Sequence, residues 1–181
     1  MRKLSLFLLI GFLILALTGC SQISTQTSFD LNEEGKMDIE INLRAAKMMA
    51  GNQAQTFIWG LLNSVPELQN NYTLTQETKT IDYSDYVLYT FNTKGRIDVT
   101  EHDYITFSES TDGSYRFELE IPTLLSEVSE SEKDTRAFTI SVALPKAIDM
   151  SNSRDLSGNT ATWTIYYHEL TSPTTLKAMT K

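Results

Sequence analysis

Apolar residues alternate with polar ones through most of this chain, and this period of two constrains its fold more than any other feature. The alternation runs into residues 33–36, which contain a glycine, and resumes directly after them. Alternation places successive side chains on opposite faces of a β-strand, and two such runs joined by a turn predict a β-hairpin. The apolar members of the two runs are Phe29, Leu31, Met37, Ile39, Ile41 and Leu43.

The same alternation predicts further strands along the chain. The dipeptide Asp112-Gly113 favours a tight hairpin between two of them. The segments 126–134 and 151–159 are polar and lack an apolar face, so we expect them to be exposed loops. The expected strands are residues 73–81, 83–91, 104–109, 114–121, 138–144, 160–167 and 174–179.

One segment changes period. Apolar residues between 57 and 65 fall on a single helical stripe, with Asn52 as a start signal and Pro66 as a stop signal. We therefore expect an α+β fold, with a curved antiparallel β-sheet of about seven or eight strands and one main amphipathic helix packed on a face.

The first twenty residues have the layout of a lipoprotein signal. A basic start is followed by the apolar run 4–17 and by Leu17-Thr18-Gly19-Cys20, which contains the single cysteine of the chain. The run is shorter than the roughly 20 residues of a membrane-spanning helix, although such a helix and an ordinary cleaved signal are the alternatives. We expect residues 1–19 to be a signal peptide, 20–27 the lipidated cysteine with a tether, and 28–181 one globular domain.

Charge limits the partners of the mature chain. Cleavage before Cys20 removes two of the 15 basic residues and leaves 13 against 23 acidic ones. A negative field of this size opposes nucleic acid and flat docking on anionic lipid. We therefore expect contact with the membrane through acyl chains on Cys20, and a location in the cell envelope on the extracytoplasmic side of a membrane.

No residue cluster has the pattern of a catalytic or metal site. The sequence lacks a Gly-x-Ser-x-Gly elbow and a glycine-rich phosphate loop. His102 and His168 stand beside carboxylates, but adjacent residues of a strand point to opposite faces, so solvated loops are the simpler interpretation. Asn71-Tyr72-Thr73 matches a glycosylation triplet, which occurs often by chance. We expect no enzyme activity, no cofactor and no metal.

Aromatic residues are the candidate ligand contacts. Tyr86 and Tyr166 fall opposite to the buried set of their strands, and Trp59 lies about 100° from Ile58 around the expected helix. Aromatic side chains with polar tips suit amphiphiles and sugars. Ordinary cross-strand pairing and core packing are the structural alternatives. We predict that Trp59, Tyr86 and Tyr166 bind a lipid or glycolipid between the helix and the sheet.

The C-terminal part of the chain resembles the LppM-type domain of bacterial envelope lipoproteins. The similarity is strongest over residues 143–178 and could extend from Ser28 to Thr180. It implies a curved α/β or β-rich domain with a proposed role in binding an envelope lipid or glycolipid, without established catalytic residues. Such proteins often continue into a transmembrane helix, whereas this sequence stops at Lys181, so we expect Cys20 to be its anchor. The matching residues are Ala143-Leu144-Pro145, Ile148, Asn152, Gly158 to Trp163 and Leu176-Lys177-Ala178.

Three functions are compatible with these features. The first is a non-catalytic lipoprotein that binds a lipid or glycolipid in an apolar cavity. The second is an assembly partner that recruits another envelope protein through an exposed strand edge or the acidic segment 126–134. The third is a hydrolase with two carboxylates within about 5–10 Å in a cleft. We rank them in this order.

Overall fold

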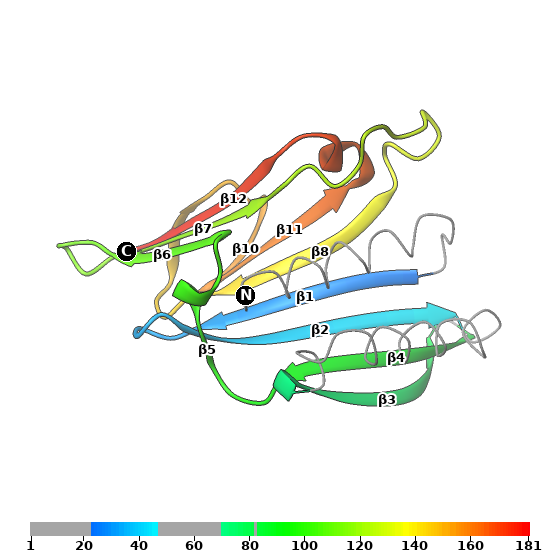
Figure 1. The fold of residues 1–181 in the computed structure, drawn as a ribbon, viewed down its shortest axis with the longest axis horizontal. Helices are drawn as coiled ribbons and strands as arrows, with labels where there is room; N and C mark the ends of the chain where they lie inside the picture. Colours follow the sequence, from blue (N-terminus) through cyan, green and yellow to red (C-terminus); the bar gives the residue numbers. More distant parts are fainter. Residues whose placement is uncertain (1–22, 47–69, 82) are drawn as a thin grey trace.

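The computed structural model describes residues 23–46, 70–81 and 83–181. In these residues the backbone forms two β-sheets and two short 3-10 helices (Figure 1). The helices are η2 (Val99–Glu101) and η3 (Tyr167–Thr171).

The larger sheet has the order β10-β11-β8-β1-β2-β4-β3, with β5 paired to β2. Its strands pair antiparallel with one exception, since β1 and β8 run parallel. The strands are β1 (Ile23–Leu31), β2 (Lys36–Ala46), β3 (Tyr72–Ile81), β4 (Ser84–Thr93), β5 (Ile97–Asp98), β8 (Arg136–Ala143), β10 (Asp155–Ser157) and β11 (Thr160–Tyr166).

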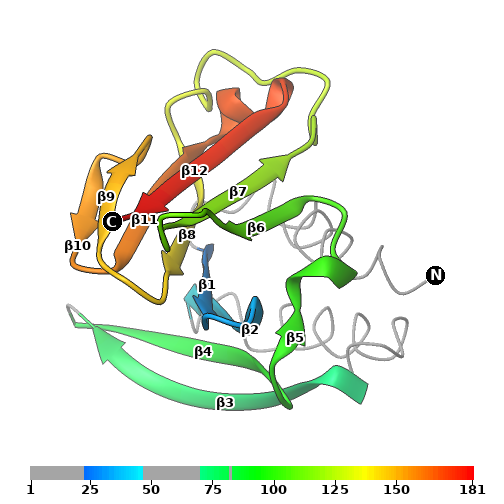
Figure 2. The ribbon, with the colours of Figure 1, turned by 90° about the vertical axis from the view of Figure 1, so that its left-hand side faces the viewer.

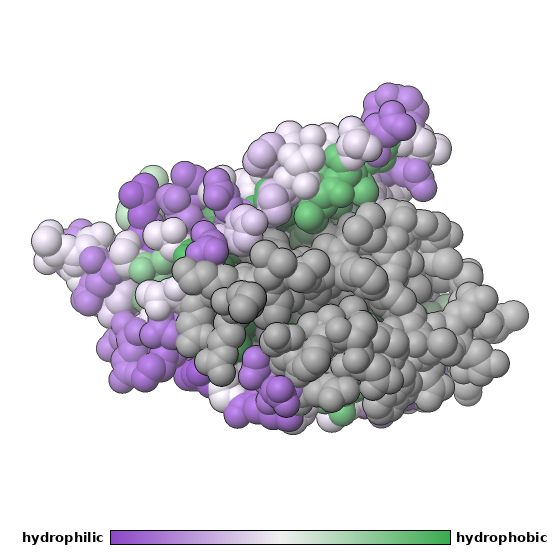
Figure 3. All heavy atoms as spheres, in the orientation of Figure 1, coloured by the Kyte–Doolittle hydropathy of each residue, from purple (hydrophilic) through white to green (hydrophobic). Residues whose placement is uncertain are grey.

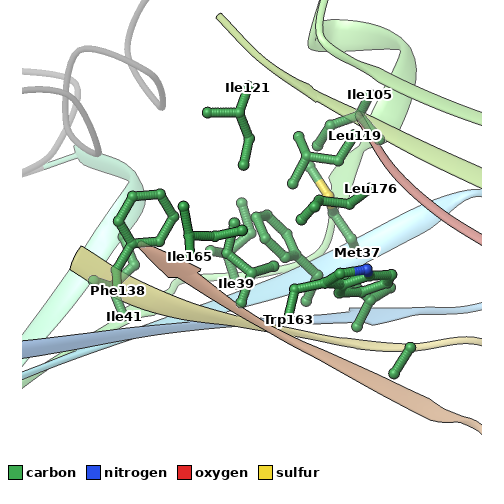
Figure 4. Packing of buried hydrophobic residues seen from close by; sticks show 14 of the residues in the cluster. Met37, Ile39, Ile41, Ile105, Leu119, Ile121, Phe138, Trp163, Ile165 and Leu176 are labelled. Carbon is green, nitrogen blue, oxygen red and sulfur yellow. The ribbon is translucent and has the colours of Figure 1, made fainter. Parts of the chain in front are cut away.

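The smaller sheet has the order β6-β7-β12-β9 and lies on one face of the larger sheet (Figure 2). Its strands are β6 (Ile105–Glu109), β7 (Tyr115–Ile121), β9 (Ile148–Ser151) and β12 (Thr174–Thr180). The facing sides of the two sheets carry the buried apolar residues, and Figure 4 shows side chains from β2, β8 and β11 meeting those from β6, β7 and β12. The core is therefore the space between two sheets.

The expected α+β fold, one antiparallel sheet with a main helix, is wrong. The strands form two facing sheets, one pair is parallel, and the described residues contain no main amphipathic helix. Alternation shows which face of a strand is buried but not which strand lies beside it, so it could not separate the strands into two sheets. The segment 52–65, expected to form the helix, lies outside the described residues.

The predicted hairpin is confirmed. Phe29 pairs with Ile39 in the β1–β2 register, and the side-chain oxygen of Asn32 accepts the backbone N–H groups of Glu34 (3.1 Å) and Lys36 (2.9 Å). Gly35 in this turn has a φ of 73°, a conformation that glycine adopts without steric cost. The asparagine and the glycine thus shape the turn.

Two expected boundaries differ from the structure. Strand β1 begins at Ile23, inside the segment 20–27 that we expected to be a tether, and Thr25 and Thr27 are buried on its inner face. The expected loop 151–159 contains β10, which closes a short hairpin on β11. The first residues of β1 and the three residues of β10 are mostly small and polar, so neither segment has an apolar alternation to detect.

Tyr72, at the start of β3, links stability to pH. Its ring is buried, and desolvation raises the pKa of its phenol well above the usual value near 10. Because the buried phenol ionises less readily than the phenol of the unfolded chain, the fold keeps its full stability below a pH of about 10. Stability is lost as the pH rises above that value. We expect the free energy of unfolding to fall above pH of about 10, and to fall less steeply in Tyr72→Phe. Denaturant titrations at several pH values test this, and equal slopes would contradict it.

Candidate outer-face groove

The face of the large sheet that points away from the core is almost entirely polar. Because side chains alternate, every second residue of β1, β2, β4, β8 and β11 lies on this outer face. The pairing registers align these residues into rows across the sheet. One such row is Thr162, Ser141, Ser28, Glu40 and Asn92.

A groove of about 470 Å³ crosses this outer face. It lies toward the end of the sheet that holds the β1–β2 turn. The short side chains of Ser28, Ser141 and Ala143 form its floor, and longer side chains stand beside them on the neighbouring strands. The groove therefore results from small residues that two strands distant in sequence, β1 and β8, bring into register. Its walls include Asp30, Asp38, Glu40, Asn92 and Thr160.

Hydrogen bonds and ion pairs fix the polar groups around the groove. The guanidinium of Arg96 lies 3.2 Å from Asp38 and 3.6 Å from Asp30, which are cross-strand partners. The amide of Asn42 donates to Glu40 (2.6 Å). Three carboxylates and one guanidinium leave this surface negative, which disfavours anionic ligands.

The candidate aromatic residues do not form one pocket. Tyr86 on β4 and Tyr166 at the end of β11 lie at the same end of the large sheet, away from the groove. Three strands separate them, a distance of roughly 19 Å at the usual strand spacing. The guanidinium of Arg44 lies 3.7 Å from the ring centre of Tyr86, and Tyr166 stacks on His168 with ring centres 6.0 Å apart. Trp59 and Cys20 lie outside the described residues, so their roles stay predictions.

The histidines are not gathered into a metal centre. His102 is buried, and Nδ1 of His168 lies 2.6 Å from the carbonyl oxygen of Lys133. Within residues 23–46, 70–81 and 83–181, no group of three or more His, Cys, Asp or Glu side chains could hold a metal ion.

Asn152, one of the residues behind the LppM resemblance, connects two strands, β11 and β12. Its side-chain oxygen accepts the indole N–H of Trp163 (2.9 Å) and the backbone N–H of Lys177 (2.8 Å), and its amide donates to the carbonyl of Thr175 (2.8 Å). Trp163 belongs to the large sheet and Lys177 to the small one. These residues therefore hold the two sheets together.

The groove itself was not predicted from the sequence. Ser28, Ser141 and Ala143 look like ordinary outward positions of two strands. Nothing local marks Arg96 as the partner of two aspartates. The only sequence signal for a groove is the small size of Ser28, Ser141 and Ala143. This signal can be interpreted only when the strand register is known.

None of the helices in the described residues has the length and apolar character needed to cross a membrane. No protein-family model and no curated protein sequence matches the chain. Among solved structures, the chain is similar to the folded domain of the Mycobacterium tuberculosis LppM protein, determined by NMR. The two share 12% identity with a TM-score of 0.46, over 88% of this chain and 90% of that one. This is a distant likeness of fold, so we base the function on this chain's own residues.

Proposed function

We propose that this protein is a non-catalytic lipoprotein of the cell envelope, anchored through Cys20, whose outer-face groove binds the sugar part of an envelope glycolipid or glycan. The observation that carries this proposal is the groove of about 470 Å³, whose lining includes hydroxyl, amide and carboxylate groups beside apolar surface. Sites of roughly 300–1,000 Å³ with a few fixed polar groups are typical of small-ligand binding.

The chemistry of the lining supports a sugar over an acyl chain. An acyl chain in the groove would remove water from Asp38 and Glu40 without replacing their hydrogen bonds, which is costly. Sugar hydroxyls instead donate to carboxylates and exchange hydrogen bonds with Ser28, Ser141 and Thr160. The excess negative charge supports a neutral sugar over a phosphorylated one.

Binding is tested with the full-length protein in detergent and neutral oligosaccharides released from the envelope of the source organism. We expect at least one size fraction to bind, measured by titration calorimetry. Ser28→Leu fills the floor of the groove and should weaken binding about tenfold or more, which corresponds to about 1.4 kcal/mol.

Ser24→Leu is the matched control. Ser24 lies on the same strand and the same face, four residues from Ser28 and outside the groove. It should bind like the unaltered protein. Equal binding by Ser28→Leu, or no binding of any fraction, would overturn the proposal. Comparing the affinity for a bound sugar with the affinity for its lipid-linked form shows whether the groove recognises a glycan or a glycolipid.

Strand β3 supports an assembly partner as a second candidate. It is an edge strand of ten residues, and its residues 75–80 are exposed on both faces. An exposed edge strand can add a strand from another protein. Cross-linking from Thr78→Cys in intact cells would distinguish this role, since a specific protein adduct favours it and the sugar proposal does not need one.

A further inference from the structure

We propose that the end of the β-sandwich nearest the lipid anchor contacts the bilayer directly, with Tyr83 entering its interfacial layer. The inference rests on acylation of Cys20, which is part of the proposed function, but it does not depend on sugar binding in the groove.

The position of β1 fixes which end faces the membrane. Strand β1 begins at Ile23, three residues after Cys20. An extended chain spans at most about 3.6 Å per residue, so the start of β1 lies within roughly 11 Å of the acylated residue. The acyl chains therefore hold this end of the sheet close to the bilayer surface.

The pairing registers show what else lies at this end. Ile23 pairs with Ala45 at the end of β2, and Ala45 pairs with Val87 near the start of β4. The tip of the β3–β4 hairpin therefore lies at this end of the sheet, on the right in Figure 1. The start of β8 and the end of β11 lie at the same end. The β1–β2 turn and the C-terminus lie at the opposite end.

Tyr83 occupies the tip of the β3–β4 hairpin. The hairpin closes between Ile81 and Ser84, and the Tyr83 side chain has a relative exposure of 104%. Its φ is 63°, a left-handed conformation in which a tyrosine is strained and glycine or asparagine is the usual residue. Neither packing nor backbone geometry accounts for an aromatic side chain at this position, whereas insertion into a bilayer interface does.

Other side chains at this end have the same amphipathic character. Tyr166 has a relative exposure of 38%, and the ring of Tyr86 lies beneath the Arg44 guanidinium. Tyrosine is enriched at membrane interfaces because its ring is apolar and its tip is polar. Leu124 and Leu125 are half-buried beside η3, since their backbone N–H groups donate to the carbonyl of Leu170 (2.9 and 3.1 Å). Figure 3 shows apolar surface in the region of η3.

Lys79 is the only basic residue of the β3–β4 hairpin, residues 72–93, and an acidic neighbour balances its charge. Lys79, next to Tyr86 in the β3–β4 register, forms an ion pair with Glu77 at 2.6 Å. Contact with the bilayer therefore orients a protein that the acyl chains already hold, and it is not a separate membrane anchor. It also places the groove roughly 20 Å from the membrane, since Ser28 to Asp30 lie five to seven strand residues beyond Ile23.

The test places an environment-sensitive fluorophore at each end of the sandwich. Cys20 is the only cysteine, and acylation occupies its thiol, so Tyr83→Cys and Thr111→Cys each provide a single labelling site. Thr111 is the matched control because it is also exposed at a hairpin tip, near Lys146 at the opposite end of β8. The full-length acylated variants are labelled with a nitrobenzoxadiazole group and reconstituted into phosphatidylethanolamine–phosphatidylglycerol vesicles.

We expect blue-shifted emission at position 83, quenched by spin-labelled lipid, and water-like emission at position 111. Water-like emission at position 83 in protein that floats with the vesicles would overturn the inference and leave the anchor in place. Failure of the full-length protein to float would overturn the anchor and this inference with it. Sugar binding is measured separately in detergent, and its result depends neither on the anchor nor on the contact of Tyr83 with the bilayer.

Discussion

Replacing Cys20 with serine is expected to release the protein from the membrane. Two or three acyl chains contribute about 0.8 kcal/mol per buried methylene, whereas a surface with mixed charges and a few tyrosines holds a protein only weakly. The serine side chain cannot form the thioether through which these chains are attached. We therefore expect the Cys20→Ser protein to move from the membrane fraction to the soluble or secreted fraction, or to keep its uncleaved leader. Fractionation after metabolic labelling with an alkynyl fatty acid measures both changes.

Ser21→Ala is the control for this experiment, because it alters the neighbouring residue and leaves the thiol in place. It should stay in the membrane fraction and incorporate label. Membrane retention of Cys20→Ser at the leader-cleaved mass, or absence of label from the unaltered protein, would contradict the anchor.

The second large effect is expected on stability, from Asn152→Ala. The Asn152 side chain makes three hydrogen bonds that connect β11 of the large sheet with β12 of the small sheet. Its removal leaves the indole N–H of Trp163 without its acceptor, and Trp163 has a relative exposure of only 6%. Loss of the bonds, with one buried donor left unsatisfied, should destabilise the fold by about 2–3 kcal/mol. Urea titration monitored by tryptophan fluorescence measures this difference.

Asn159→Ala gives a graded comparison. The Asn159 amide makes one hydrogen bond across strands, to the carbonyl of Leu144 (2.8 Å). Its loss should cost about 1 kcal/mol. Our account of Asn152 as a joint between the sheets would be wrong if the two alanine variants were equally stable.

Local features of the sequence predicted the hairpins well. The β1–β2 and β6–β7 pairs each join runs of alternating residues through a short turn, so their partners are neighbours in sequence. Contacts of this kind depend on turn chemistry and on strand patterning, both of which are visible in a few residues. The strand expected at 138–144 and the last strand at 174–179 were found for the same reason.

Pairing between distant segments was not predictable. Strand β1 lies parallel to β8, about a hundred residues later in the chain, and Asn152 reaches both Trp163 and Lys177. The groove depends on the same long-range register, because Ser28 and Ser141 become neighbours only when β1 and β8 pair. A shift of one residue would turn these side chains to the other face.

The sequence by itself determined the local structure of the strands and of the turns between them, because residue type and spacing decide these features. It specified which residues of each strand are buried and where the hairpins turn, and it predicts acylation of Cys20, because each property depends on neighbours within a few positions. The tertiary structure decided that the strands form two sheets, that small residues create a groove, and that Tyr83 and the start of β1 lie at one end of the molecule. These are consequences of pairing between segments far apart in the chain, which alternation alone does not encode.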